Sequence, residues 1–323
     1  MILVTGGTGF IGSHLLDRLA DAGEPVRALV RPTKVRRKTA LPRGVEPVSG
    51  DLATGEGLVE AARGADTVIH IAGVLKALTP DDYYRGNARA TENLARAAAG
   101  QATRFVLVSS LAVCGPSPAD GSVNEDSETR PLTHYGKSKL EAERSVRSLL
   151  PQAVIVRPPV VYGPRDTAVF PFLKSIARGL ELRIGGGEHW FSAIYVRDLV
   201  DGILAASTSP QALGRTYFLS HAQPVNWTQL GDTTARLVNR NRLVLRVPVS
   251  AAYGIGYLAE RWSALTRTPG MVSREKISEA TCARWVCDTR RAADELGFEA
   301  KTSLAAGLAE TLAWYKEAGW VKY

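Results

Sequence analysis

The chain has 323 residues, of which 45% are hydrophobic and 22% charged, and its formal net charge is +8. This length can bury one large α/β core or two lobes, and no apolar run approaches the roughly 20 residues of a membrane-spanning helix. Glycines interrupt the first apolar stretch, unlike a signal peptide, and three scattered cysteines suit neither a disulfide framework nor a metal site. We therefore expect a cytoplasmic protein with reduced thiols, no stable membrane span and no metal. The positive charge comes with no nucleic-acid motif, so no nucleic-acid partner is expected.

The first half of the chain alternates short β-prone runs with helical patterns. The expected strands are 2–4, 26–30, 45–48, 67–70, 105–109 and 154–157. The expected helices are 12–22, 55–63, 81–99 and 135–150. This alternation predicts a doubly wound parallel (Rossmann) sheet of the α/β class, with ligands bound beyond the carboxyl ends of its strands.

Prolines and glycines break this regularity after Arg157. Residues 193–206 have the pattern of a strand that runs into a helix, 216–219 could form another strand, and the pattern from 224 onward is helical and amphipathic. We therefore predict a dinucleotide-binding domain over residues 1–165, to which segments near 193–219 return. Residues 166–323 would then form mainly a smaller, discontinuous substrate-binding lobe.

A glycine-rich turn separates the first expected strand from the first expected helix. Residues 7–12 (GTGFIG) match the pattern GxGxxG, in which glycine permits a tight turn and a close approach of the pyrophosphate to the backbone. The free N–H groups at the start of the helix would then face the phosphates. The predicted cofactor contacts in this turn are Gly6, Gly9, Phe10, Ile11 and Gly12.

The end of the second expected strand bears on the choice of cofactor. The position of the usual ribose-binding carboxylate is occupied by Val30, and Arg31 follows it, with Lys34, Arg36 and Arg37 close behind. Guanidinium groups suit a 2′-phosphate, so we expect NADP(H) to be favoured over NAD(H). A solvated basic loop is the alternative interpretation.

Two further strand ends supply candidate cofactor contacts. Asp51 and Leu52 follow the third strand, where a carboxylate can accept from an adenine amino group or cap a helix. Ala72 and Gly73 follow the fourth strand, and their small side chains would let a cofactor lie against the backbone. His70, beside them, is expected to be a structural histidine.

Tyr135 and Lys139 stand four residues apart at the start of an expected helix and therefore share one of its faces. An ammonium group near a phenol lowers the phenol pKa, and such a tyrosine can exchange a proton with a carbonyl or alcohol oxygen. A hydroxyl that binds the same oxygen should come from Ser109 or Ser110, at the end of the fifth strand.

Together these segments resemble the extended short-chain dehydrogenase/reductases of the NAD-dependent epimerase/dehydratase superfamily. The matching segments are TGGTGFIG, GDL, HIAG, VSSLAVCG, YGKSK, RPPVVYGP and IYVRDLV. The resemblance implies that Tyr135 is the catalytic acid/base and that Lys139 is its pKa partner and a ribose contact. It also implies a catalytic hydroxyl five residues before Gly115, which selects Ser110.

The resemblance has three further implications. It places Asn87 and Pro158 among the cofactor-site residues, with Asn87 bending its helix and supporting a water molecule. It implies a homodimer formed through helices 81–99 and 135–150. It also provides the substrate candidates Cys114, Tyr162 and Trp190.

The sequence departs from this family in ways that narrow the reaction. Leu111 and Ala112 stand where dehydratases carry an Asp-Glu pair, Val160 where sugar-nucleotide epimerases carry an asparagine, and Cys114 where a tyrosine is usual. The pocket is therefore expected to be less polar than a sugar-diphosphate site. This favours a dehydrogenase or reductase of a bulky, fairly apolar small-molecule substrate, steroid-like or flavonoid-like, as in the branch of 3β-hydroxysteroid dehydrogenases and dihydroflavonol reductases.

Two other functions stay open at this point. One is a nucleotide-sugar epimerase with tightly held NAD, and the other is a non-catalytic nucleotide-sensing or assembly protein, against which the intact Tyr135 and Lys139 argue. Residues 251–265 include Tyr253, Ile255 and Leu258 and raise the question of membrane contact, but the charges of residues 260 and 261 favour an ordinary amphipathic helix.

Overall fold

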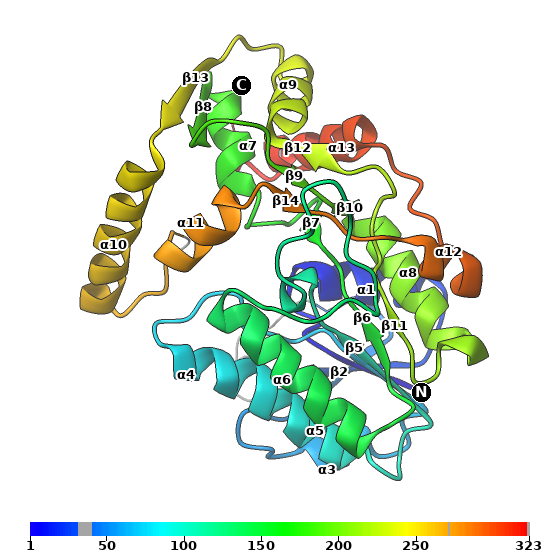
Figure 1. Ribbon diagram of the computed structural model, residues 1–323. Coiled ribbons are helices and arrows are strands. Elements are labelled where there is room, and N and C mark those ends of the chain that lie inside the picture. Colours follow the sequence, from blue (N-terminus) through cyan, green and yellow to red (C-terminus); the bar gives the residue numbers. More distant parts are fainter. Residues whose placement is uncertain (32–40, 271, 322–323) are drawn as a thin grey trace.

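The computed structural model describes residues 1–31, 41–270 and 272–321 (Figure 1). Its centre is a parallel sheet of seven strands: β1 (Ile2–Thr5), β2 (Val26–Val30), β3 (Val45–Ser49), β4 (Thr67–His70), β5 (Arg104–Val108), β6 (Val154–Val156) and β11 (Thr216–Tyr217). The strand order β11-β6-β5-β4-β1-β2-β3 reverses direction at β1, where β4 lies on one side and β2 on the other. This arrangement confirms the predicted doubly wound α/β fold.

Helices cover both faces of the sheet. One face packs against α1 (Phe10–Asp21) and α8 (Val196–Thr208), the other against α3 (Leu58–Ala62), α5 (Ala90–Ala98) and α6 (His134–Leu149). Successive strand residues alternate between the two layers: in β5, Val106 and Val108 belong to the first core, and Phe105 and Leu107 to the second. Because both faces are buried, β1, β5 and β6 read as nearly continuous apolar runs in the sequence, whereas the edge strand β3 is largely exposed and contains Glu46 and Pro47.

The predicted helix over residues 81–99 is interrupted in the structure. It consists of α4 (Pro80–Tyr83), the π-helical segment η1 (Tyr84–Arg89) and α5. The capping box of Thr79 and Asp82 starts it, with Pro80 at the first helical position. The π-helical turn contains Asn87, and such turns occur mostly at functional sites.

The chain leaves the sheet after β6 and builds a second group of elements, drawn in the upper part of Figure 1. These are β7 (Val160–Tyr162), α7 (Phe170–Ala177), β8 (Leu180–Ile184), β9 (Trp190–Phe191), β10 (Ala193–Tyr195), β12 (Val225–Asn226), α9 (Trp227–Leu237), β13 (Leu243–Val247), α10 (Val249–Thr266), α11 (Arg274–Thr281), β14 (Arg284–Trp285), α12 (Arg290–Leu296) and α13 (Leu304–Glu317). An aromatic-rich core is shared by β7, α7, β9, β10, β12, α9, β14 and α13, and in it Phe170 lies 5.0 Å, between ring centroids, from Tyr315 and from Trp320. The sheet is regained through β10, α8, the short turn η3 (Pro210–Ala212) and β11.

The helical pattern expected from residue 224 onward is only partly right. The structure has three short strands in this region, of which β13 pairs in parallel with β8 along its whole length. The alternation that marks a half-buried strand is missing there, because four of the five β13 residues are exposed and both faces carry leucine or valine. The sequence of β13 therefore lacks the alternation of apolar and polar residues by which a strand is distinguished from a helix.

Candidate functional site

The glycine turn packs too closely for any larger residue. Gly6 has a φ of 75°, and a Cβ built on it would lie 2.6 Å from the backbone nitrogen of Ala72. A Cβ on Gly12 would lie 2.7 Å from the carbonyl carbon of Gly6 and 2.8 Å from Cα of Gly7. The turn is closed by a hydrogen bond from the Gly9 N–H to the Gly6 carbonyl, 2.9 Å long. The backbone at the start of α1 is therefore bare and lies against the loop after β4.

The start of α1 has the properties of an anion site. Gly9 is the N-cap residue, no side chain caps the helix, and its first turn contains no carboxylate. The backbone N–H groups of Phe10 and Ile11 thus have no side-chain acceptor at the N-cap, at the positive end of the helix dipole. Because the cradle is formed by glycines and lies at the switch in strand order, these residues fit the pyrophosphate of a dinucleotide.

The other predicted cofactor contacts lie along the same edge of the sheet. Arg31 directly follows β2, is exposed and has no ion-pair partner among the described residues. Lys34, Arg36 and Arg37 lie outside the described residues. Asp51, directly after Gly50 beyond β3, accepts a hydrogen bond from the Ala53 N–H at 2.7 Å, and the Leu52 carbonyl accepts from Asn93 at 2.9 Å. The Asp51 carboxylate therefore shapes its own turn and keeps further acceptor capacity.

Tyr135 and Ser110 meet where α6 begins beside the end of β5. Ser110 starts the 3-10 turn η2 (Leu111–Val113), and Thr133 caps α6 through a hydrogen bond from the Gly136 N–H. A Cβ on Gly136 would lie 2.6 Å from the Ala112 carbonyl oxygen, so glycine is what lets α6 and η2 touch. This packing brings the Ser110 side chain close enough to the Tyr135 phenol to lower the phenol pKa.

Lys139 lies one turn further along α6 and is buried. Its Nζ donates to the Val108 carbonyl at 2.7 Å, at the last residue of β5. A Cβ on Gly73 would lie 3.7 Å from this nitrogen and 3.2 Å from Oδ1 of Asn87. The ammonium therefore stands beside the loop after β4, where a cofactor held by the glycine turn would extend.

Burial controls the proton affinities of these two side chains. It raises the pKa of Tyr135 to about 12, and the hydrogen bond from Ser110 partly offsets that rise. It lowers the pKa of Lys139 to about 8, against the opposing effect of the Glu143 carboxylate. The pKa of Tyr135 is therefore raised and not lowered as expected, because desolvation of the phenol is the largest effect and Lys139 is not among the groups that shift it. At neutral pH this tyrosine holds its proton and is a potential proton donor.

Asn87 links the loop after β4 to α6 through its side-chain hydrogen bonds. Its side chain accepts from the Val74 N–H at 2.7 Å, and its Nδ2 donates to the Ser138 hydroxyl at 2.9 Å and to the Val74 carbonyl at 3.2 Å. These bonds tie η1 both to the loop after β4 and to α6. The hydrogen-bonding capacity of the buried amide is thus used to fix the loop that carries Ala72 and Gly73.

A buried ion pair joins α6, which carries the predicted catalytic residues, to the end of β6, and sequence analysis missed it. Arg157 donates to both carboxylate oxygens of Glu143, at 3.0 and 2.7 Å, and its third nitrogen lies 3.5 Å from the Cys114 sulfur. Glu143 comes four residues after Lys139, so one turn of α6 links the pair to the ammonium group. The spacing of Tyr135, Lys139 and Glu143 was the available signal. The partner Arg157 could not be found, since it follows a different strand.

Helix α11 covers the start of α6, which sequence analysis also did not predict. The Thr133 hydroxyl hydrogen-bonds to Glu279 at 3.0 Å, and the His134 N–H donates to Glu275 at 3.1 Å. The Lys276 ammonium lies 5.4 Å from the centre of the Tyr135 ring and pairs with Glu279 at 2.7 Å. The predicted catalytic tyrosine is therefore contacted by an element from the far end of the chain.

Of the three predicted substrate residues, Cys114 and Tyr162 are buried and Trp190 is half-buried. Cys114 is 3% exposed in a small apolar cluster, and burial raises its pKa to about 11. Tyr162 is buried against Tyr195 in the core of the second group of elements, and Trp190 is half-buried in β9. The carbonyl of Pro158 accepts from the Leu111 N–H at 2.9 Å and so supports the turn that starts at Ser110.

Two neighbouring polar residues have structural roles. The ring of His70 hydrogen-bonds to Thr5 and Thr91, and complete burial lowers its pKa to about 3. Ser109, beside Ser110, has a buried hydroxyl with no hydrogen-bond partner in the described part of the chain. It therefore provides a matched comparison for Ser110.

Residues 2–219 match the NAD dependent epimerase/dehydratase family, and the chain belongs to that family. It is 33% identical over 322 residues to a ceramide reductase of Caulobacter vibrioides, covering 99% of this chain and 96% of that one. It is 32% identical over 272 residues to 4-hydroxy-2-methyl-3-oxo-4-farnesyl-3,4-dihydroquinoline-1-oxide ketoreductase of Stigmatella aurantiaca, covering 81% and 80%. These similarities identify an NAD(P)-dependent enzyme of the oxidoreductase and epimerase type.

Epimerases are similar to this chain as well. N-acetyl-alpha-D-glucosaminyl-diphospho-ditrans,octacis-undecaprenol 4-epimerase of Escherichia coli O157:H7 is 27% identical, with 96% of this chain and 94% of that one covered. Among solved structures, MoeE5 in complex with UDP-glucose and NAD superposes with a TM-score of 0.79 at 26% identity, covering 98% and 99%.

The glycine cradle leads to a test of cofactor binding. Gly12→Ala places a methyl group against the Gly6 backbone, so it should weaken NADPH and NADH binding alike and cost about 1–3 kcal/mol of unfolding free energy. Cofactor affinity is measured by fluorescence titration and stability by urea denaturation. Gly254→Ala is the control, because a Cβ there has no neighbour within 4 Å. Unchanged cofactor affinity in Gly12→Ala would contradict the placement of the pyrophosphate.

Proposed function

We propose that this protein is an NADP(H)-dependent reductase that interconverts a ketone and a secondary alcohol on a bulky, apolar, lipid-like molecule. The observation that carries the proposal is the close packing of α6 on the turn of Ser110, which brings Tyr135 to this serine, with the Lys139 ammonium one turn away. The three groups lie at the carboxyl edge of the sheet, at the end reached from the glycine turn. Such a set can bind a carbonyl oxygen and deliver a proton to it.

The chain's own residues handle the substrate oxygen and its proton. Ser110 and Tyr135 both donate to the carbonyl oxygen, and Tyr135 transfers its proton as negative charge develops there. Lys139 favours the resulting phenolate electrostatically, since its ammonium lies on the same helix face. When bound, the nicotinamide cofactor supplies the hydride to the carbonyl carbon. The ketone thus gains one hydride at carbon and one proton at oxygen and becomes the secondary alcohol.

The substrate class follows from similarity and from the polarity of the site. The ceramide reductase match spans nearly the whole chain, and ceramide is a long-chain lipid with a secondary hydroxyl. Val160, at the position of the epimerase asparagine, is 39% exposed and offers no hydrogen bond. We therefore propose the ketone of a ceramide-like lipid, bound between the sheet and the lobe formed mainly by residues 166–323. This choice replaces the steroid-like or flavonoid-like scaffold with a long-chain one of the same apolar character.

A sugar epimerase with tightly held NAD is the second candidate. It is favoured by the similarity to MoeE5 and to the undecaprenol-linked epimerase. The substitutions at Val160 and Cys114 count against it, because both remove polar groups from the expected diphosphate site.

A cytoplasmic homodimer that pairs through α5 and α6 is part of the proposal. These two helices contact one another on one outer face of the sheet (Figure 1).

The catalytic assignment is tested by single substitutions. Tyr135→Phe and Lys139→Met should each lower kcat by about 10²–10⁴-fold. Ser110→Ala should lower it by about 10²–10³-fold, because one donor to the developing oxyanion is lost. Ser109→Ala is the matched control and should leave kcat nearly unchanged. NADPH absorbance with a ketone substrate is the readout, and equal effects of the two serine substitutions would contradict the role of Ser110.

The pH dependence of reduction is expected to follow Lys139. The ammonium is present below its pKa of about 8 and is lost as the pH rises through that value, so kcat should be level at lower pH and fall above it. Lys139→Arg keeps its charge throughout this range and should be slower but without the fall. If kcat of Lys139→Arg falls at the same pH, the fall is caused by the titration of another group.

Cofactor preference is tested at Arg31. Arg31→Asp should weaken NADPH binding by about tenfold to a hundredfold, the worth of a charged hydrogen bond, and leave NADH binding nearly unchanged. Arg215→Asp is the control, since Arg215 precedes β11 at the amino-terminal edge of the sheet. If wild-type protein binds NADH as tightly as NADPH, the proposed 2′-phosphate contact is wrong.

A further inference from the structure

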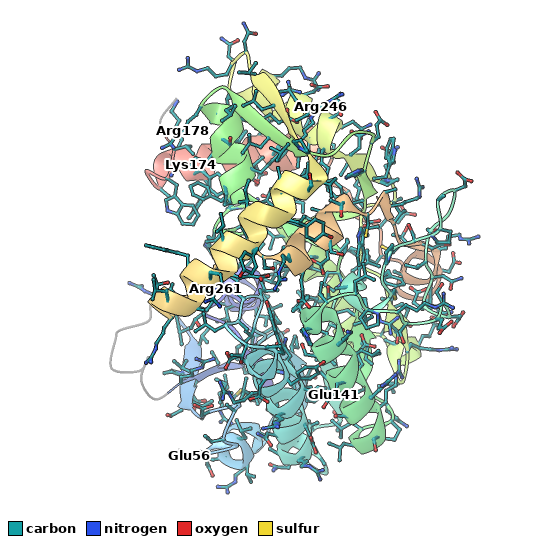
Figure 2. The ribbon with its side chains drawn as sticks, turned by 60° about the vertical axis from the view of Figure 1, so that its left-hand side comes forward. Glu56, Glu141, Lys174, Arg178, Arg246 and Arg261 are labelled. Carbon is teal, nitrogen blue, oxygen red and sulfur yellow. The ribbon has the colours of Figure 1, made fainter. Side chains whose placement is uncertain are left out.

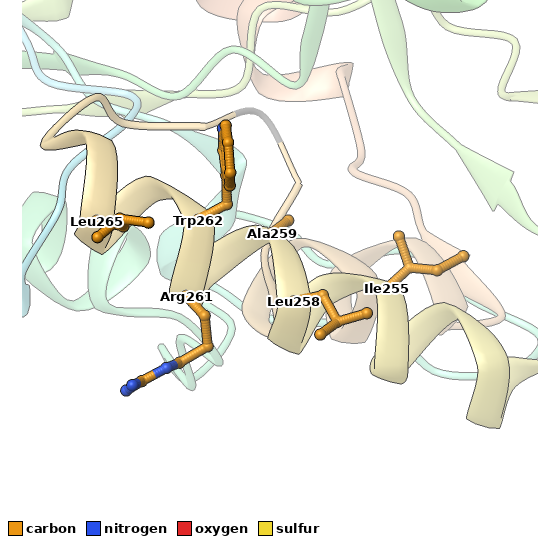
Figure 3. Close-up of a pocket in the computed structure, with 6 residues that line it drawn as sticks. All are labelled: Ile255, Leu258, Ala259, Arg261, Trp262 and Leu265. Carbon is orange, nitrogen blue, oxygen red and sulfur yellow. The ribbon is translucent and has the colours of Figure 1, made fainter.

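Helix α10 presents an apolar face to solvent. Ile255, Leu258, Trp262 and Leu265 are 54%, 67%, 68% and 77% exposed, and their spacing puts them on one side of the helix. With Ala259 and Arg261 they line a shallow pocket along the helix (Figure 3). Of the 18 residues of α10, only Ala252 and Gly256 are buried. The helix thus exposes its large apolar side chains, and the two residues that it buries are small.

The buried side of α10 rests on α11. A Cβ on Gly256 would lie 2.6 Å from Cδ1 of Ile277, and the Glu260 carboxylate receives the Arg274 N–H and guanidinium, at 2.8 and 2.7 Å. These contacts fix the direction in which the apolar face points. The exposed face is therefore a defined surface and not the result of a loosely attached helix.

The apolar surface continues into the strand before α10. Leu243, Val244 and Leu245 in β13 and Val249 at the start of α10 are exposed, as is Leu182 in the neighbouring β8. In the described part of the chain β13 pairs with β8 alone. Contiguous apolar surfaces of this kind on a soluble protein mark an interaction site.

Basic residues accompany this surface. Residues 240–267 contain five arginines and one carboxylate, Glu260, which is held by Arg274 on the α11 side. Arg246, Arg261 and Arg267 are exposed and have no ion-pair partner within the described ranges. Figure 2 shows Arg246 beside β13 and Arg261 near the other end of α10, whereas the labelled acidic residues Glu56 and Glu141 lie on the dinucleotide-binding part.

We propose that α10 and β13 form a docking surface for a lipid bilayer that carries anionic headgroups. The apolar stripe would lie at the level of the acyl chains, and the arginines would contact the headgroups. Among residues 1–31, 41–270 and 272–321, no helix is long and apolar enough to cross a bilayer, so the contact is peripheral. A two-fold contact with a second copy would place like-charged arginines near one another, whereas anionic headgroups neutralise them.

The position of α11 gives this surface a link to the catalytic site. The same short helix packs under α10 and contacts Thr133, His134 and Tyr135. A protein docked through α10 would therefore have the cover of its site close to the membrane. This part of the inference rests on the proposed function, because a lipid ketone would be met there.

The test measures binding of the full chain to vesicles without any substrate. Vesicles of phosphatidylcholine with phosphatidylglycerol should bind the protein in sedimentation assays, and vesicles of phosphatidylcholine alone should bind it less. Trp262 is the most exposed of the six tryptophans, so its emission should shift to shorter wavelength on binding. No sedimentation with anionic vesicles would overturn the proposal.

Surface variants assign the binding to α10. Leu258→Ser should weaken it by about tenfold, and Arg261→Ser and Arg267→Ser by about fivefold each. Val59→Ser is the matched control, because Val59 is 57% exposed on α3, at the far end of the molecule. All four variants should keep the urea midpoint of the wild type, since the side chains are exposed. Equal binding by Leu258→Ser and Val59→Ser would overturn the proposal.

Two further experiments test whether a second copy of the chain occupies this surface and whether the proposed function is right. If the lipid-free protein is a dimer that Leu258→Ser converts to monomers, the surface is a contact between copies and the lipid proposal is wrong. Reduction of a short-chain, water-soluble ketone in the absence of vesicles tests the proposed function alone. That activity should be the same in Leu258→Ser and wild type. If the protein binds vesicles but reduces no ketone, the proposed docking surface stands and the proposed function is wrong.

Discussion

The contact between α6 and the turn after β5 is the constraint on which the proposed chemistry depends. Gly136 allows the start of α6 to reach the Ala112 carbonyl, and the approach brings Tyr135 to Ser110. The same packing directs the Lys139 ammonium to the last carbonyl of β5. A larger residue at position 136 would separate the phenol from the hydroxyl. The geometry of three functional side chains thus rests on one close approach of backbone to backbone.

Burial and a buried ion pair then set the chemistry of these groups. Desolvation keeps the Tyr135 phenol protonated and brings the pKa of Lys139 to about 8. The Glu143 carboxylate opposes the second effect, and Arg157 donates a hydrogen bond to each of its oxygens. The side chains that support Lys139 therefore include Arg157, which directly follows β6, as well as Glu143 on α6. Helix α11 adds a cover that ties the site to the exposed surface of α10.

The doubly wound parallel sheet could be predicted because it rests on local signals, and local signals also selected Ser110, Tyr135 and Lys139 as catalytic candidates. Continuous apolar strands, glycine spacing and the four-residue separation of Tyr135 and Lys139 are all visible in the chain. The contact of α11 with Tyr135 and the ion pair of Arg157 with Glu143 could not be predicted. The first joins segments 141 residues apart and the second joins residues 14 apart, and in each case the two partners belong to different elements. The strand β13 was also missed, because an exposed strand with leucine and valine on both faces has no periodic pattern. Residues 251–265 gave the right helix, but only the structure shows that its apolar side faces solvent.

Transfer of deuteride from labelled cofactor tests the central claim most directly. The protein is given NADPH deuterated at C4 and the ketone of a ceramide, and the product is analysed by mass spectrometry. Our account predicts an alcohol that carries one deuterium on the carbinol carbon, formed in step with the loss of NADPH. Tyr135→Phe should form it about 10²–10⁴-fold more slowly. Formation of sugar epimers from a sugar nucleotide, without deuterium and without net loss of cofactor, would contradict it.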